Sequence, residues 1–575
     1  MDHMMTYLIL VVVALGVIVA LSTISERIGI ASPLILMSVG VVISLLPVVQ
    51  PIPINPEWIL MVLLPPLLYA AAISIPTVEL RRDLSAVGGL AVILVVISAF
   101  ILGVVIHALI PTVSLPFAIA LGAILSPTDA AATTVIKRLG VPGRVGIILQ
   151  GEALFNDATS LVLLRSAIAA TMTTVSLWQF IGSFARAALI AAIIGVAVGW
   201  AGVRLRRLIH SPAPATVLSL LLPFLAYIPS ELLEASGLVA AVAAGITAAQ
   251  LGPKHLDARQ RIAERENWRT LEFLLEGAVF LLMGLELYGL VVDLYKTHDT
   301  LWLAMGLAAV AIVITLVVRW VFLSILVRHS AARTHRKAEW SRGWGPPQGA
   351  SPDGLSQADR RRHQELMRRR DALKAHPDQV EDADRAKAIG RWSHLRRRFT
   401  RYIADVDYWL RQPLGSKEVI LLTWSGMRGV VTLAAAQTLP LWTPHRSLLI
   451  LIAFFVAAGS LILQGGSLPW TVKALGLAGQ DATPADDWTR LQTELDHLAS
   501  PGAPTQPDAA TGPADPSPAP AQPLGELAQL RARREALLEL RSTGTYASRT
   551  LSTALAELDA EEIRIQLNLS AQNPD

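Results

Sequence analysis

Long apolar stretches with almost no charge run through most of the chain, and they constrain its fold more than any other feature. A helix needs about 20 mostly apolar residues to cross the hydrocarbon core of a bilayer. Thirteen segments approach that requirement, near residues 6–25, 33–49, 57–75, 86–110, 115–137, 144–170, 177–203, 213–231, 236–252, 268–292, 300–328, 416–440 and 445–473. Only 16% of the residues are charged, against about 25% in soluble domains. We therefore predict an all-α polytopic membrane protein with thirteen transmembrane helices.

The positions of the basic residues support this count, because cytoplasmic loops are enriched in Lys and Arg. The connections that follow the even-numbered spans contain a single basic residue, Lys296. The odd-numbered connections contain Arg27, Arg81, Arg82, Lys137, Arg138, Arg144, Arg204, Arg206, Arg207, Lys254, Arg259, Arg261 and Arg265, followed by the basic segment 329–415. We expect the protein in the plasma (inner) membrane, with its N-terminus outside and its C-terminus in the cytoplasm. An even number of spans is the weaker alternative.

Two polar segments carry opposite charge. Residues 329–415 hold 19 Lys/Arg against 11 Asp/Glu, and residues 476–575 hold 7 against 15. We predict a transmembrane domain over 1–475 that contains the basic cytoplasmic insertion 329–415. An acidic cytoplasmic tail over 476–575 follows, with a Pro/Ala-rich linker at 499–524 and a helical hairpin. The arginine runs of the insertion could contact anionic lipid headgroups, and a solvated loop is the alternative.

Several catalytic classes lack any signature in this chain. It has no cysteine, and no Walker-type phosphate loop, dinucleotide fingerprint, HExxH or nucleophile elbow appears. We therefore predict that the protein is not an enzyme and uses neither a cofactor nor a nucleic-acid partner. Transport across the membrane would then be driven by an ion gradient rather than by ATP.

The fifth predicted span contains the sequence Ser126-Pro127-Thr128-Asp129 in an apolar run. Pro127 lacks a backbone N–H and disfavours helical geometry at Ser126, so we expect the helix to break there. The freed carbonyls and the side chains of Thr128 and Asp129 would be potential ion ligands, as in the discontinuous helices of transporters. The alternative is a proline kink whose backbone is satisfied by Thr128 and Asp129.

The sixth predicted span contains Glu152, Asn156 and Asp157. On a helix Glu152 and Asn156 share a face, whereas Glu152 and Asp157 diverge by about 140°. Asp157 can therefore face the same cavity as the break at Asp129, where burial favours the protonated acid and a bound cation favours the carboxylate. Proton and cation would compete for one site. The alternative is that both acids form structural ion pairs.

The twelfth predicted span places Arg428 between Gly426 and Gly429. The two glycines permit close approach or local unwinding. We predict that Arg428 pairs with Glu152 as structural scaffolding, since removing one partner of a buried pair leaves an unpaired charge. Substrate binding by Arg428 is the alternative.

These segments together resemble the monovalent cation/proton antiporters of the CPA1 class, the sodium/proton exchanger family. The residues that carry the resemblance are Ser126–Asp129, Gly151–Asp157, Trp424–Gly429 and Gln464-Gly465. The resemblance implies thirteen helices in two inverted six-helix repeats, with the fifth and twelfth helices crossing as broken helices. It also implies a homodimer whose transport bundle moves like an elevator.

The resemblance further assigns roles to residues of this chain. Asp157 would carry the cation or the proton, with Asn156 as its supporting amide and Thr128 and Asp129 at the crossing point. Asp157 and Thr128 would be ligands of the transported metal ion. The Asn-Asp order at 156–157 is the version associated with electroneutral exchange.

Two departures from the family pattern leave the transported ion open. Ala70 stands where many relatives have an acid, and Ala153 where many archaeal members have a serine. Fewer side-chain oxygens make K⁺ plausible beside Na⁺. The leading hypothesis is Na⁺ (or K⁺)/H⁺ antiport. A K⁺-selective antiporter, a cation channel and a membrane signalling receptor are the alternatives. The roles of Arg165 and Glu276, inside the sixth and tenth spans, stay open.

Overall fold

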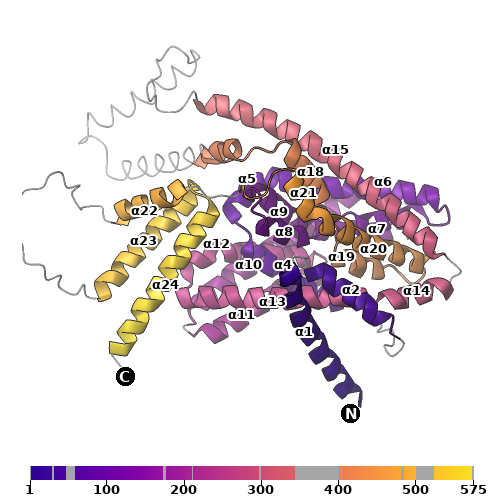
Figure 1. Cartoon of the computed structure of the whole chain (residues 1–575), viewed down its shortest axis with the longest axis horizontal. Helices are drawn as coiled ribbons and strands as arrows, with labels where there is room; N and C mark the ends of the chain where they lie inside the picture. Colours follow the sequence, from indigo (N-terminus) through magenta and orange to yellow (C-terminus); the bar gives the residue numbers. More distant parts are fainter. Residues whose placement is uncertain are drawn as a thin grey trace, which may run out of the picture. The chain divides into compact units, whose positions relative to one another are not determined.

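The structure, a computed structural model, describes residues 2–28, 32–46, 58–171, 177–209, 211–296, 300–342, 401–402, 404–480, 485–499 and 523–572. Within these ranges the regular elements are helices, and none of the described residues forms a strand (Figure 1). The predictions for the arginine runs of 360–398 and for most of the linker 499–524 fall outside the described residues.

The described residues form a succession of helices, in which three short π-helical segments (η1, η2 and η4) continue into α-helices. In chain order the elements are α1 (Asp2–Ile28), α2 (Ser32–Ser44), η1 (Ile59–Leu63), α4 (Leu64–Ser74), α5 (Thr77–Gly88), η2 (Gly89–Leu94), α6 (Val95–Leu109), α7 (Leu115–Leu125), α8 (Ala131–Arg138), α9 (Gly143–Ala169), α10 (Leu177–Arg207), α11 (Pro212–Leu232), α12 (Gly237–His255), α13 (Ala258–Leu285), α14 (Leu287–Lys296), α15 (Leu301–Arg342), α18 (Ser416–Trp424), α19 (Val430–Gln437), α20 (Arg446–Ser460), η4 (Leu461–Gly465), α21 (Gly466–Ala474), α22 (Ala485–Ala499), α23 (Pro523–Thr543) and α24 (Ser548–Gln572).

Seven helical stretches among the described residues are long and apolar enough to cross a membrane. They are Thr77–Leu109, Gly143–Ala169, Ala185–Arg206, Pro212–Leu232, Ala258–Tyr295, Leu301–Ala332 and Arg446–Ala474. Shorter apolar helices cover Val11–Ser25, Ser32–Ser44, Ile59–Ser74 and Leu115–Leu125. Each of the thirteen predicted ranges contains helix. The number of spans and the inverted repeats stay predictions.

Several helices extend beyond the ranges that hydropathy indicates. In the fourth predicted span the helix begins at Thr77 rather than at 86, and in the tenth it begins at Ala258 rather than at 268. In the eleventh it continues past 328 to Arg342. The added turn of α5 is polar, yet Asp83 is buried there because Arg144 of α9 donates to its Oδ1 at 2.8 Å. Ion pairing thus lets a charged segment stay helical and packed where the hydropathy pattern ends.

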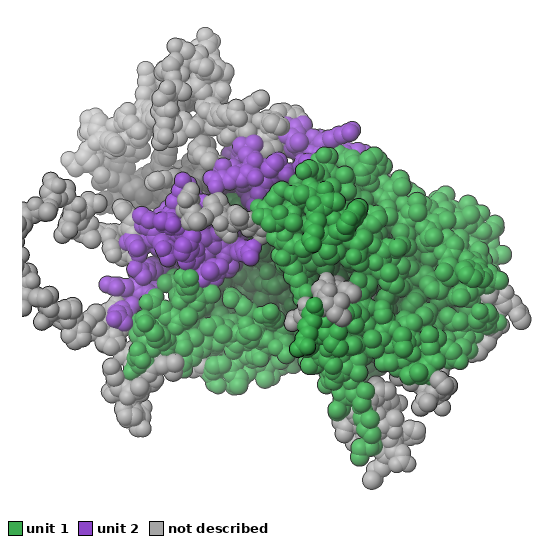
Figure 2. All heavy atoms as spheres, viewed as in Figure 1, with its two compact units in different colours: residues 1–324, 416–483, 556–575 green, residues 325–415, 484–555 purple. Residues whose placement is uncertain are grey.

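The chain forms two compact units (Figure 2). Unit 1 comprises 1–324, 416–483 and 556–575, and unit 2 comprises 325–415 and 484–555. Helices α22 and α23 pack together in unit 2, where Arg533 donates to Asp496 at 2.9 Å and the Tyr546 hydroxyl donates to Glu494 at 2.6 Å. The later part of α24 belongs to unit 1, where Arg261 Nε donates to Asp559 Oδ2 at 3.1 Å. The predicted division at residue 475 stays a prediction.

Two groups of helices pack within unit 1. The first, called here the site bundle, consists of α5–α9 and α18–α21 with η2 and η4. The second, called the companion bundle, consists of α1, α2, α4 and α10–α13 with η1. An apolar cluster joins the two bundles, in which Leu80, Val87 and Leu154 pack with Leu68 and Val242. This arrangement places α9, the helix of Glu152 and Asp157, beside the companion bundle.

Candidate functional site

Two broken helices meet in the site bundle. The helix of α7 ends at Leu125 and resumes as α8 at Ala131, and that of α18 ends at Trp424 and resumes as α19 at Val430. The two non-helical links touch, because the Asp129 N–H donates to the Met427 carbonyl at 2.8 Å. Both predicted breaks, at Ser126-Pro127 and at Gly426–Gly429, coincide with these links. Four half-helix ends therefore lie close to one point inside the protein.

Opposite charges satisfy these half-helix ends. Arg428 donates from Nε to Leu125 O, at the carbonyl end of α7, at 3.1 Å and from Nη1 to Gly426 O, in the link that follows α18, at 2.5 Å. Asp129 accepts the Ala131 N–H at 3.1 Å, at the start of α8. Helix carbonyl ends attract cations and helix amino ends attract anions. Arg428 and Asp129 thus match the dipoles of the broken helices.

Gly429 lets Asp129 reach the second amino end. A Cβ added at Gly429, directly before α19, would lie 1.5 Å from Asp129 Oδ2. The Asp129 carboxylate therefore rests against the backbone at the start of α19, a place where any side chain would exclude it.

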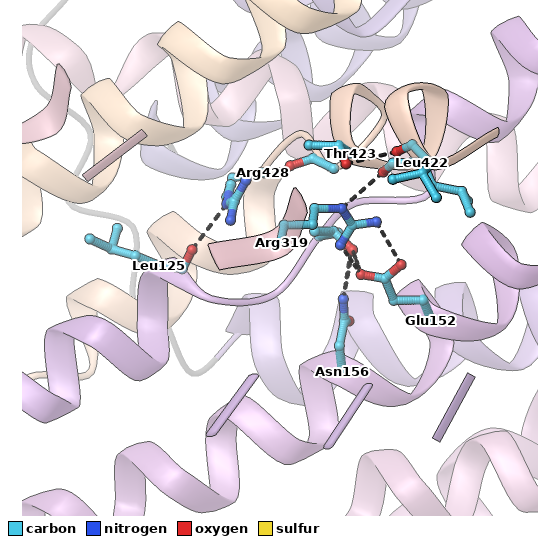
Figure 3. Close-up of polar contacts among 10 residues, drawn as sticks. Leu125, Glu152, Asn156, Arg319, Leu422, Thr423 and Arg428 are labelled. Carbon is cyan, nitrogen blue, oxygen red and sulfur yellow. Dashed lines mark hydrogen bonds and ion pairs between the residues drawn. The ribbon is translucent and has the colours of Figure 1, made fainter. Parts of the chain in front are cut away.

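The prediction that Arg428 pairs with Glu152 is wrong, because Glu152 pairs with Arg319 of α15 (Figure 3). Arg319 Nη2 donates to Glu152 Oε2 at 2.7 Å, Nη1 contacts Oε1, and Nε donates to Leu422 O at 2.9 Å. Both side chains are 2% exposed. Arg428 instead donates to the backbone carbonyls of Leu125 and Gly426.

Gly426 makes room for this ion pair. A Cβ at Gly426 would lie 2.6 Å from Arg319 Nε and 2.9 Å from its Cζ. The two glycines of the twelfth predicted span therefore admit two charged side chains from other helices, Arg319 at Gly426 and Asp129 at Gly429.

A chain of hydrogen bonds leads from Arg319 to the residue next to Asp157. The Thr128 hydroxyl donates to Glu152 Oε1 at 3.0 Å. Asn156 Nδ2 donates to the Thr128 carbonyl at 3.0 Å and to its hydroxyl oxygen at 2.9 Å. Asn156 Oδ1 is buried and has no partner among the described residues. The structure therefore brings Thr128, Glu152 and Asn156 together, and it leaves one amide oxygen available.

Asp157 differs from every neighbour in this network. It is 8% exposed, yet its carboxylate makes no hydrogen bond or ion pair with any residue that the structure describes. The negative charge of Asp129 repels a negative charge on the Asp157 carboxylate. An ionised carboxylate buried without a partner is costly. Asp157 is therefore the acidic side chain of this network that has no polar partner among the described residues.

The family of the chain follows from a comparison with known proteins. The family model described as "Sodium/hydrogen exchanger, transmembrane" matches residues 11–360, more than half of the chain. The chain belongs to the sodium/hydrogen exchanger family.

Curated relatives include an uncharacterized Na⁺/H⁺ exchanger of Escherichia coli (strain K12), 35% identical over 48% of this chain and 53% of that protein. The sodium, potassium, lithium and rubidium/H⁺ antiporter of Bacillus pumilus is 33% identical over 48% of this chain and 43% of that protein. The chain thus spans about half the length of these two relatives. Among solved structures, the sodium proton antiporter MjNhaP1 from Methanocaldococcus jannaschii has the same fold, with TM-score 0.56 and 17% identity over 83% of this chain and all of that one.

The two alanines that stand where many relatives have an oxygen-bearing side chain are buried. Ala70 is 3% exposed and Ala153 is 6% exposed. Among the described residues, no group of three or more His, Cys, Asp or Glu could hold a metal ion.

The two residues left open by the sequence lie apart. Arg165 Nη1 donates to Glu231 Oε2 of α11 at 3.2 Å. Glu276 of α13 has Asp129 and Glu272 as its acidic neighbours. The two do not pair with each other.

Arg319 is the site residue that the sequence interpretation missed. Its signal was present, because it is an arginine inside the apolar run 301–328, and an ionisable residue within a span indicates a functional or structural partner. Sign matching alone could not choose between Arg319 and Arg428 as the partner of Glu152.

Proposed function

We propose that this protein is a secondary active antiporter that exchanges Na⁺ or K⁺ for H⁺ across the plasma (inner) membrane. The observation that carries the proposal is the Asp157 carboxylate, which is buried and has no partner among the described residues, beside a polar network whose other charges are paired or bound at helix ends. Membership of the sodium/hydrogen exchanger family supports it.

Competition at Asp157 couples the two ions. The side chain is neutral when protonated and its charge is balanced when a monovalent cation is bound, but it is unpaired when empty. Only the protonated and cation-bound forms of Asp157 avoid an unbalanced buried charge. One carboxylate beside the neutral Asn156 holds one cation or one proton, so we propose electroneutral exchange of one ion for the other.

The oxygens available to a cation favour a weakly selective site. Asn156 Oδ1 has no partner among the described residues, and Thr128 offers oxygens that already accept from Asn156. We propose Asp157 and Thr128 as metal ligands, with Asn156 and Asp129 supporting the site. The Bacillus relative is named for sodium, potassium, lithium and rubidium, and Ala70 and Ala153 supply no oxygen. A K⁺-selective antiporter is therefore the second candidate.

We propose that alternating access moves the site bundle against the companion bundle, in a homodimer with its N-terminus outside and its C-terminus in the cytoplasm. The separation of the two bundles by an apolar interface supports the movement. The distribution of Lys and Arg among the connections supports the orientation.

The test is exchange in proteoliposomes at zero membrane potential. Asp157→Asn should abolish proton flux driven by Na⁺ or K⁺ while the purified protein keeps its elution volume and Tm. Asp407→Asn is the matched control, because Asp407 is half exposed and pairs only with Arg411 among the described residues. Exchange by Asp157→Asn at the rate of the unmodified protein would reject the role of Asp157.

A further inference from the structure

A second ion pair on α9 joins the two bundles at the predicted outer end of that helix. Arg165 lies eight residues after Asp157, about 12 Å further along the helix axis. Its Nη1 donates to Glu231 Oε2 of α11 at 3.2 Å. The connections that follow α9 and α11, near 171–176 and 232–235, are both predicted to be outside. The pair therefore bridges the helix of the transport site and the companion bundle on the outer side.

The companion bundle fixes the acidic partner. Glu231 Oε1 accepts the Gly237 N–H, at the start of α12, at 3.0 Å. Glu231 is thus held by the turn between α11 and α12, and it presents its other oxygen to Arg165. The Arg165 side chain, in contrast, is 62% exposed. One partner is held in place and the other is free to leave.

The pair lies beside the apolar contact between the two bundles. A small cleft of about 20 Å³ lies beside the pair, and both Arg165 and Glu231 line it. Its walls come from both bundles, with Leu161 and Val162 of α9 on one side and Tyr227 and Leu238 of α11 and α12 on the other. Leu161 packs against the buried Tyr227 and Leu238, so the ion pair borders a packed contact between the two bundles.

We propose that the Arg165–Glu231 pair is an outer latch, which closes the external side of the transport path in this conformation and opens when the site faces outward. The inference rests on the proposed alternating access at Asp157. An exposed ion pair contributes little to folding, so it can break in every cycle. It still sets the balance between the two conformations, because it forms in only one of them.

The absence of cysteine in the chain allows a direct test. Arg165→Cys and Glu231→Cys are introduced together, and a short bifunctional thiol reagent that a reductant can cleave links them. Proteoliposome exchange should be lost on cross-linking and should return on reduction. The control double variant is Glu231→Cys with Glu234→Cys, whose link lies within the companion bundle and should leave exchange at the rate that this variant shows before linking. Complete cross-linking of the first pair with undiminished exchange would overturn the latch and leave the role of Asp157 standing.

A charge swap gives a second readout that does not depend on transport. Leu161→Cys places a single thiol in the cleft, and its reaction with a membrane-impermeant maleimide added outside reports how open the cleft is. Arg165→Glu should raise the labelling rate about two- to fivefold, the range expected from losing one exposed pair. Adding Glu231→Arg should return the rate to that of Leu161→Cys alone. Equal rates in all three proteins would contradict the latch.

Discussion

Two of the ion pairs on helix α9 have opposite character. Glu152, in its middle, binds Arg319 with both side chains 2% exposed. Arg165, near its outer end, binds Glu231 with side chains 62% and 26% exposed. A buried pair cannot lose one partner without leaving an uncompensated charge, whereas water solvates the partners of an exposed pair once they separate. The difference indicates that the first pair fixes the site and the second is free to respond to conformation.

The buried pair is supported by further hydrogen bonds. Arg319 also donates to Leu422 O, and Glu152 also accepts from Thr128. A buried ion pair is stable only when its remaining donors and acceptors are satisfied. The pair therefore connects α15, the end of α18 and the break at Thr128, and it holds Asn156 beside Asp157.

The largest effect on stability is expected from breaking the buried pair. Arg319→Ala leaves Glu152 charged and unpaired at 2% exposure, so the free energy of unfolding should fall by about 3–5 kcal/mol. Thermal unfolding of the purified protein measures the change. A Tm equal to that of the unmodified protein would show that the pair does not hold the site.

A smaller loss is expected from crowding the same pair. In Gly426→Ala the new Cβ would lie 2.6 Å from Arg319 Nε, and displacing a packed group costs about 1–3 kcal/mol. Gly146→Ala is the matched control, because a Cβ at Gly146 of α9 meets nothing within 4 Å. Equal unfolding temperatures for the two variants would contradict the close approach of Arg319 to Gly426.

The smallest loss of stability is expected at the exposed pair. Arg165→Gln should change the free energy of unfolding by about 0–1 kcal/mol, although it should shift the conformational balance as argued above. Unfolding in low and high salt provides the check, since added salt screens an exposed pair. A loss as large as that of Arg319→Ala would remove the distinction between the two pairs.

Much of this site follows from local sequence signals. Pro127 and the two glycines predict where the helices break, because proline removes a backbone donor and glycine admits close approach. Asp157 is indicated by an acid inside an apolar span. These signals need only neighbouring residues along the chain.

The partners across the fold could not be predicted in the same way. Glu152 lies 167 residues before Arg319, and a single sequence does not state which of several intramembrane arginines reaches it. The role of Arg428 depends on the carbonyl of Leu125, which no side-chain pattern reveals. The early starts of α5 and α13 were missed because their first turns are polar.

The central claim is that one side chain, Asp157, holds either a proton or a cation. The most direct measurement adds Na⁺ or K⁺ to the purified protein in weakly buffered solution and records the protons released. Because binding linkage is reciprocal, about one proton should appear per bound cation in the unmodified protein and in Asp407→Asn, and none in Asp157→Asn. Cation binding with no proton release, or with the same release from Asp157→Asn, would contradict the account.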